Sequence, residues 1–151
     1  MAEGGRDAAW NDPEATAAAF LDGWFRSGDM GYVDVDVDGD DMLFVFDRLK
    51  DVIIRGGPNI DCAEVEAAIQ GHPGIAEAAV VGRAHPTLGE EVVAVVVVEH
   101  GTISGEVLRA YLSSRLAAYK MPTTIVLRDD PLPRTDTGKV LKRQLRDELT
   151  A

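Results

Sequence analysis

Residues 61–83, DCAEVEAAIQGHPGIAEAAVVGR, place a helix signal directly before a strand signal, and this succession decides the fold class. Asp61 is a suitable N-cap, and Glu64 follows at capping-box spacing. Gly71 and Pro73 indicate where the helix ends. Small apolar residues then predict a strand over residues 78–83.

The alternation of helices and strands continues toward the C-terminus. Residues 91–99 are apolar enough to form the central strand of a sheet. Ser104 is expected to cap a helix that ends near Leu116, and a strand is expected over residues 123–127. The last expected element is an amphipathic helix whose apolar residues are Val140, Leu141, Leu145 and Leu149.

The residues before position 61 predict smaller elements. A short helix is expected over residues 13–21, with Asp12 as its cap and Pro13 in its first turn. A hairpin with an acidic turn follows, and its second strand covers residues 42–46. The whole order predicts an α+β fold, in which a hairpin and an acidic segment precede a small mixed sheet covered by helices.

Charge divides the chain into two parts. Residues 1–47 hold 12 acidic and 2 basic residues, whereas residues 48–151 hold 14 acidic and 13 basic residues. We therefore expect a first piece over 1–47 and a second over 48–151. Five basic residues gather between positions 134 and 146, where they could meet a polyphosphate. The net charge of −11 argues against a nucleic-acid partner, because such binding rests on neutralising phosphates.

Composition excludes several other classes of protein. The single cysteine, Cys62, cannot form an internal disulfide framework or a multi-cysteine metal site, and it fits a cytoplasmic location. The N-terminal residues lack the pattern of a signal peptide. The longest apolar run, VVAVVVV at 92–98, is far shorter than the roughly 18 residues of a membrane span, so none is expected.

The sequence matches parts of a calcium-binding motif and of a phosphate-binding motif, but it lacks an essential residue of each. Asp34, Asp36, Asp38 and Gly39 follow an EF-hand pattern, yet Val45 stands where the final Glu should be, so an acidic hairpin turn is the better interpretation. Gly138–Lys139 resembles the end of a P-loop, but Val140 replaces its Ser or Thr.

The remaining candidate ligands favour structural roles. His72, His85 and His100 have no ligand spacing, so no metal site is predicted. Cys62 in the first turn of a helix is interpreted as a structural thiol. Arg55–Pro58, RGGP, is interpreted on its own as a turn.

Three segments in order carry a family resemblance. DGWFRSGDMGYVD at 22–34, DRLKDVIIRGGPNIDCAEVE at 47–66 and LPRTDTGK at 132–139 resemble successive signature motifs of the adenylate-forming superfamily. That superfamily includes acyl-CoA synthetases, luciferases and the adenylation domains of peptide synthetases. The resemblance implies that residues 1–47 are the tail of a large adenylate-binding domain, that residues 48–151 are the small mobile domain, and that the rest of the large domain is missing from this chain.

The resemblance also implies a role for individual residues. Asp29 would hold the ribose hydroxyls of ATP, and Arg48 would contact the ribose or phosphate. Lys50 would be the hinge, and Gly57 would line the tunnel for the pantetheine arm of CoA. Lys139 would reach the α-phosphate and the substrate carboxylate during adenylation, where a cation stabilises developing negative charge. ATP, CoA and Mg²⁺ are the expected cofactors, with the Mg²⁺ ligands in the missing domain.

Departures from the family pattern indicate which branch of the superfamily the chain resembles most. Ser27 stands for the usual Thr and keeps its hydroxyl, Asp47 stands for a common Gly, and Cys62 for a common Pro. These variants resemble the fatty-acyl and luciferase-like branches, so the expected substrate is a fatty or related carboxylic acid. The expected activity is that of an acid–thiol ligase, with the isolated chain inactive. The alternative is a free-standing small domain that docks on another protein without activity of its own.

Overall fold

The computed structural model describes residues 12–36, 38–48, 51–99 and 103–150, which fall into two compact units, 1–49 and 50–151. In the first unit, α1 (Pro13–Ala19) is capped by Asp12, whose Oδ1 accepts a hydrogen bond from the Ala15 amide at 2.9 Å. The expected continuation of this helix to residue 21 is wrong. Phe20 is extended because it pairs with Phe25 in a small hairpin of β1 (Phe20–Leu21) and β2 (Trp24–Phe25).

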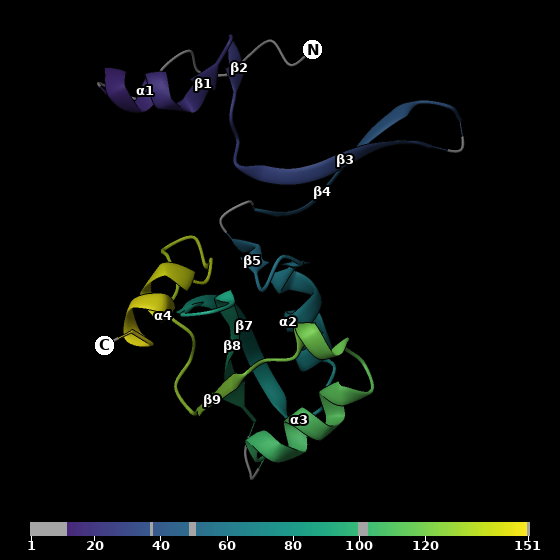
Figure 1. Ribbon diagram of the computed structural model, residues 1–151, viewed down its shortest axis with the longest axis vertical. Coiled ribbons are helices and arrows are strands. Elements are labelled where there is room, and N and C mark those ends of the chain that lie inside the picture. The colour runs from purple at the N-terminus through teal and green to yellow at the C-terminus, as the bar shows by residue number, and fades with distance from the viewer. Residues whose placement is uncertain (1–11, 37, 49–50, 100–102, 151) are drawn as a thin grey trace. The chain divides into compact units, whose positions relative to one another are not determined.

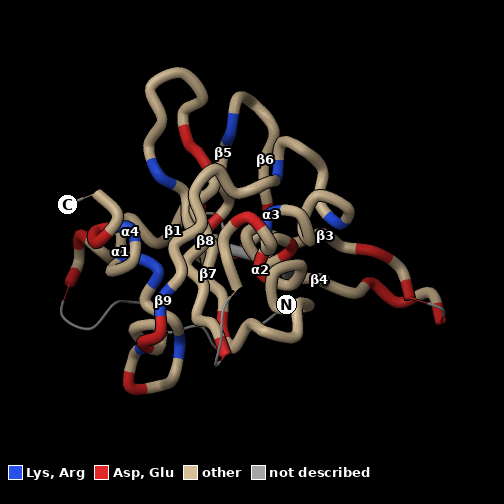
Figure 2. Tube along the Cα trace, turned by 90° about the horizontal axis from the view of Figure 1, so that it is seen from below, with Lys and Arg blue, Asp and Glu red and all other residues tan. Residues whose placement is uncertain are grey.

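The larger hairpin of the first unit confirms the predicted acidic turn. Strand β3 (Asp29–Val35) runs antiparallel to β4 (Asp41–Arg48). Asp36 closes the turn, because its Oδ1 accepts hydrogen bonds from the amides of Asp38 and Asp40, each at 2.9 Å. Figure 2 shows how acidic residues gather at this end of the hairpin.

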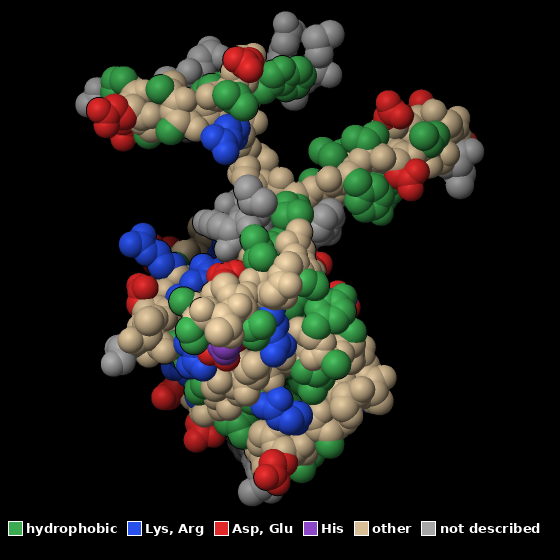
Figure 3. All heavy atoms as spheres, viewed as in Figure 1, with side chains coloured by type: hydrophobic (Ala, Val, Ile, Leu, Met, Phe, Trp, Pro, Cys, Tyr) green, Lys and Arg blue, Asp and Glu red, His purple; other side chains and the backbone are tan. Residues whose placement is uncertain are grey.

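The first unit has no buried core of its own among residues 12–45, where every described side chain is exposed or half-buried. Hydrophobic side chains therefore lie on its surface, as the space-filling view of the hairpin shows (Figure 3). The exposed large residues include Trp24, Phe25, Val33, Leu43 and Val45. Such a surface is typical of a segment that packs against a further part of its protein.

The second unit is built on a three-stranded mixed sheet. Strand β7 (Ile75–His85) runs antiparallel to β8 (Gly89–Val98), and β8 runs parallel to β9 (Thr124–Arg128). The central position predicted for residues 91–99 is confirmed. Strand β7 is longer at both ends than predicted, because Ile75 and His85 still pair with residues of β8.

Helices cover both faces of this sheet (Figure 1). On one face α2 (Cys62–Gln70) and α3 (Gly105–Ser113) pack against the side chains of Val80, Val92 and Val96. On the other face α4 (Lys142–Glu148) and Leu132 pack against Val81, Val93 and Val95. Because neighbouring strand residues point to opposite faces, one valine-rich strand supplies both cores. The predicted α+β fold is confirmed.

The predicted helix caps are confirmed in the second unit. Asp61 Oδ1 accepts from the Ala63 amide at 2.7 Å, and Ser104 Oγ accepts from the Val107 amide at 3.3 Å. The capping box itself does not form, because the Glu64 carboxylate accepts hydrogen bonds from Lys120 Nζ and not from the Asp61 amide. Lys120 belongs to a short 3₁₀ helix, Ala118–Lys120.

The first residues of the second unit form a small hairpin before α2. Its strands are β5 (Ile53–Ile54) and β6 (Asn59–Ile60), which pair antiparallel. The turn between them lies near the sheet, since the Gly56 amide donates to the carbonyl of Leu88 at 2.8 Å. Within the described residues, no helix is long and apolar enough to cross a bilayer.

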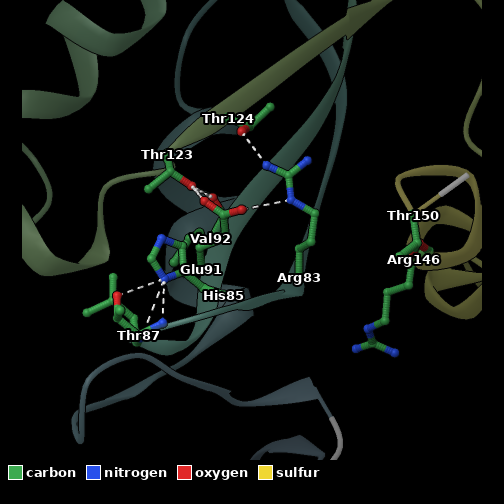
Figure 4. A network of polar contacts seen from close by, with 10 residues as sticks. Arg83, His85, Thr87, Glu91, Val92, Thr123, Thr124, Arg146 and Thr150 are labelled. Atoms are coloured by element: carbon green, nitrogen blue, oxygen red, sulfur yellow. Dashed lines mark hydrogen bonds and ion pairs between the residues drawn. The ribbon is translucent and has the colours of Figure 1, made fainter.

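A polar network fastens β9 to β8 (Figure 4). Glu91 accepts hydrogen bonds from Arg83 Nε at 2.8 Å and from Thr123 Oγ1 at 2.7 Å, and Arg83 also donates to Thr124 at 3.0 Å. These bonds lower the pKa of Glu91, with the Thr123 hydroxyl as the largest cause and Arg83 next.

Candidate functional site

The segment that carries Lys139 is a closed turn. We call residues 133–141 the lysine turn. The Thr135 amide donates to the Lys139 carbonyl at 2.8 Å, and the Leu141 amide donates to the Pro133 carbonyl at 2.8 Å. Thr135 Oγ1 also accepts from the Lys139 amide at 3.1 Å. The lysine is therefore presented from a hydrogen-bonded scaffold.

Gly138 gives the turn its shape. Its φ of 83° lies in the left-handed region, where a residue with a side chain would be strained. This backbone directs the chain back on itself, and Arg134 then bridges to Val140. The predicted start of the last helix is wrong: Val140 and Leu141 belong to the turn, and the helix begins later, at Lys142.

The side chain of Lys139 is exposed at the tip of the turn. No hydrogen bond or ion pair joins its ammonium group to another of the described residues. The neighbouring residues Asp136 and Thr137 are exposed as well. An ammonium group on a long stem, held at such a tip, is suited to reach an anionic ligand.

Helix α4 is tied to α2 by an ion pair at Lys142, the residue that directly follows the lysine turn. Lys142 Nζ lies 2.8 Å from Glu66 Oε1, and the same oxygen accepts a hydrogen bond from the Val80 amide at 2.7 Å. Burial acts to lower the pKa of Lys142, but the hydrogen bond and the charge of Glu66 outweigh it and raise that pKa above 10.5. Lys142 is therefore a fixed cation that secures the start of the helix.

A second ion pair links α4 to the beginning of the second unit. Arg146 Nη2 lies 3.0 Å from Asp51 Oδ1. The carbonyl oxygen of Asp51 accepts from the buried Cys62 thiol at 2.6 Å. Cys62 is thus a structural thiol, as predicted. The helix that follows Lys139 is joined by these contacts to the residue that follows Lys50 in the chain.

The glycine turn between β5 and β6 is open. Gly57 has a φ of 112°, and a Cβ built on it would meet no atom within 4 Å. The turn is closed by the Arg55 amide, which donates to the Pro58 carbonyl at 3.1 Å. An open backbone of this kind lets a ligand pass close to the chain.

The first unit brings Asp29 and Arg48 together. They are directly opposite partners in the β3–β4 register. Asp29 is exposed, and its amide donates to Ser27 Oγ at 3.1 Å, just after Gly28 with a φ of 74°. The strand position of Arg48 is described but its side chain is not, and Lys50 lies outside the described residues.

The histidines of the described chain have local partners. His72 packs edge-on against the ring of Tyr111 with centroids 4.8 Å apart, and His85 Nδ1 accepts from the amides of Thr87 and Leu88. His100 lies outside the described residues. Across the described ranges, no group of three or more His, Cys, Asp or Glu residues could hold a metal ion.

Several residues around the lysine turn escaped prediction as parts of the site. Glu66, Glu77 and Asp51 lie far from Lys139 in sequence and stand in no motif that points to it. Their contacts with basic residues of the C-terminal segment depend on the folded sheet. The concentration of basic residues between 134 and 146 was interpreted as a segment that could meet a polyphosphate, yet Arg134, Lys142 and Arg146 pair with acidic residues of the fold.

The helix-covered mixed sheet of the second unit and most of its lysine turn lie in a region of the chain that matches a known family of domains. The chain belongs to that family, the AMP-binding enzyme C-terminal domain, whose model matches residues 64–139.

Curated relatives extend the similarity beyond that domain. The chain is 43% identical over 142 residues to a long-chain-fatty-acid–CoA ligase, FadD13, of Mycobacterium tuberculosis, with 94% of this chain and 27% of the relative covered. It is 49% identical over 138 residues to a feruloyl-CoA synthase of Amycolatopsis sp., with 91% and 27% covered. It is also 49% identical over 142 residues to an indoleacetate–CoA ligase of Aromatoleum aromaticum, with 93% and 27% covered. The chain thus spans about a quarter of these proteins.

Solved structures give the same result for the fold. The ATP-bound MatB from Rhodopseudomonas palustris superposes with a TM-score of 0.81 at 38% identity, over 93% of this chain and 27% of that one. A Mycobacterium tuberculosis fatty acyl CoA synthetase superposes with a TM-score of 0.68 at 43% identity, over 93% and 27%.

Proposed function

We propose that this chain is the C-terminal part of an ATP-dependent acyl-CoA synthetase. In the whole enzyme a carboxylic acid, ATP and CoA would give acyl-CoA, AMP and pyrophosphate. The observation that carries this proposal is the exposed Lys139 on its closed glycine turn, within a domain of the AMP-binding family. The similarity to several CoA ligases supports it.

Lys139 would act in the first half-reaction. When the carboxylate attacks the α-phosphorus, two anionic groups approach each other and charge builds on their oxygens. An ammonium group between them lowers this barrier by electrostatic stabilisation. Because its turn is held by backbone hydrogen bonds, Lys139 would enter and leave the site with the whole second unit.

The other proposed residues divide between binding and movement. Asp29 would accept hydrogen bonds from the ribose hydroxyls, and Arg48 opposite it would contact the ribose or phosphate. Lys50 would be the hinge between two poses of the second unit. Gly57 would let the pantetheine arm of CoA pass, which its open surroundings support.

The cofactors and partners follow from the same proposal. ATP would bring Mg²⁺ with it, and the ligands of that ion would lie in the large N-terminal domain, which is also the proposed partner of the exposed apolar hairpin. A fatty acid is the proposed substrate, because relatives include long-chain-fatty-acid–CoA ligases and the motif variants resemble that branch. A cytoplasmic location completes the proposal and is supported by the single cysteine.

The test is substrate-dependent pyrophosphate exchange by the full-length enzyme. A panel of palmitate, ferulate and indoleacetate with ATP should give exchange with at least one acid, and added CoA should then give the thioester. The 151-residue chain alone should give neither product. An absence of exchange with every acid would contradict the proposal and favour the alternative of a docking module.

A further inference from the structure

Arg134 joins the lysine turn to the sheet. Its Nη1 donates to the carbonyl of Gly138 at 2.7 Å, one residue before Lys139. Its Nη2 lies 3.0 Å from Glu77 Oε2. Glu77 belongs to β7, whose neighbouring residues Ala78 and Ala79 are buried in the two cores. One guanidinium therefore spans the distance between the tip of the turn and a rigid strand.

The ion pair with Arg134 also compensates the charge of Glu77. Its Oε2 is buried and accepts no hydrogen bond from the described residues, so the guanidinium compensates its charge. The Glu77 side chain as a whole is 31% exposed and that of Arg134 is 43% exposed, so this ion pair fixes geometry more than it adds stability. Glu77 therefore holds one nitrogen of the Arg134 guanidinium at the sheet. The forked shape of the group leaves its other terminal nitrogen free to donate to the Gly138 carbonyl.

Hydrogen bonds within the turn close it, but among the described residues no buried side chain anchors its tip. Asp136, Thr137, Gly138 and Lys139 are all exposed, whereas the apolar anchors of this segment, Leu132 and Leu145, lie outside the turn. Exposed backbone with few packed contacts opens easily. A bond from Arg134 to the Gly138 carbonyl restrains the tip where the lysine leaves the backbone.

We propose that Arg134, held by Glu77, is a positioning residue for Lys139. This inference rests on the proposed function and deepens it. Arg134 touches no reacting atom, and it acts by fixing the direction in which the Lys139 side chain leaves the turn. Precise placement matters because small displacements of a charged group lower its effect on a reacting centre steeply.

The experiment compares four variants of the full-length enzyme: Arg134→Ala, Arg134→Lys, Glu77→Gln and the control Arg128→Ala. Arg128 also pairs with a glutamate, Glu148 at 3.7 Å, at the other end of α4. Pyrophosphate exchange with palmitate measures adenylation, with ferulate and indoleacetate as further acids. Thioester formation from supplied palmitoyl-adenylate and CoA measures the second half-reaction.

We expect Arg134→Ala to lower kcat for adenylation roughly tenfold to a hundredfold, and to leave thioester formation close to the unmodified enzyme. Arg134→Lys should recover part of the loss, because an ammonium group can hold one of the two partners. Glu77→Gln should have a smaller effect of the same kind, and Arg128→Ala none. Unchanged adenylation in Arg134→Ala, or equal loss of both half-reactions, would overturn the inference.

Hydrogen exchange separates this inference from the proposed function. The amides of Gly138 and Lys139 donate within the turn, so they should exchange faster in Arg134→Ala and Glu77→Gln but not in Arg128→Ala. Unchanged exchange would overturn the anchoring role whatever the activity. If the unmodified enzyme adenylated no acid, the proposed function would fail, and the exchange rates would still decide whether Arg134 holds the turn.

Discussion

Asp29 and Arg48 stand directly opposite each other at the end of the β3–β4 hairpin that lies away from its acidic turn. Two residues separated along the chain by the whole hairpin thus share one position on a two-stranded ribbon. Directly opposite residues on antiparallel strands have Cβ atoms about 5 Å apart. This pairing in the register is the observation behind the proposal that Asp29 binds the ribose and that Arg48 contacts the ribose or phosphate.

Asp29→Ala should weaken both half-reactions, because the ribose is present in ATP and in the acyl-adenylate. Loss of hydrogen bonds to a carboxylate predicts a rise in KM for ATP of roughly tenfold or more. Asp34→Ala is the matched control, since Asp34 is exposed on the same strand. Steady-state kinetics of the full-length enzyme measure the change. An equal effect of the two substitutions would assign the loss to the hairpin and remove Asp29 from the binding site.

Gly57→Ala should act on the opposite half-reaction to Lys139. A methyl group would enter the open space at the glycine turn and obstruct the pantetheine arm, so thioester formation should fall while pyrophosphate exchange persists. Gly39→Ala controls for backbone strain, because Gly39 has a φ of 89° and equally open surroundings. Saturation curves for CoA measure the effect. Loss of adenylation in Gly57→Ala would show that the turn is needed for the fold and would contradict the tunnel.

Lys142→Met should destabilise the second unit by about 2 kcal/mol, less than a fully buried pair because both side chains retain some exposure. The exposed neighbour Arg143→Met should change stability by less than about 0.5 kcal/mol. Denaturant unfolding of the 151-residue chain followed by circular dichroism measures both. The raised pKa of Lys142 means that its stabilisation is complete below pH 10.5 and is lost as pH rises through the folded value. A difference between the two variants that persists unchanged at higher pH would contradict this pair.

Glu91 should contribute stability that disappears in acid. Its hydrogen bonds from Thr123 and Arg83 lower its folded pKa below 4.5, so the unfolded carboxyl binds a proton at a higher pH than the folded one. The stability difference between the unmodified chain and Glu91→Gln should be constant above pH 4.5 and shrink below it. Glu106→Gln, an exposed helix residue, gives the comparison. A stability difference that stays constant as the pH falls below 4.5 would show that the hydrogen bonds to Glu91 do not depend on the charge of its carboxylate.

Short sequence patterns correctly predicted the helices and strands whose ends depend only on residues at those ends. The caps at Asp61 and Ser104 formed as expected, because a short polar side chain satisfies the first amides of a helix wherever that helix packs. The apolar run at 92–98 predicted the central strand for an equally local reason, since only a strand covered on both faces buries every residue.

The first small hairpin was missed although its signal was present. Asp22–Gly23 lies between Phe20–Leu21 and Trp24–Phe25 and is a strong two-residue turn signal, and both residues have positive φ angles of 51° and 84°. The helix expected over residues 13–21 included the first strand of this hairpin, Phe20–Leu21. Alanine-rich sequence favours a helix, but the pairing of Phe20 with Phe25 stops that helix earlier.

The contacts that hold the lysine turn could not be predicted from local patterns. Arg146 and Asp51 are 95 residues apart, and their contact depends on the way α4 packs against the sheet. Arg134 was noticed only as one of several basic residues. The motif located Lys139, whereas the contacts of its turn became evident only in the folded structure.

The role of Lys139 is the central claim, and the half-reactions of Lys139→Ala in the full-length enzyme test it most directly. Adenylation should fall by roughly a hundredfold or more, because a preorganised charge is lost from the reacting centre. Thioester formation from supplied acyl-adenylate should stay close to that of the unmodified enzyme. Equal loss of both half-reactions, or retention of adenylation, would contradict the account.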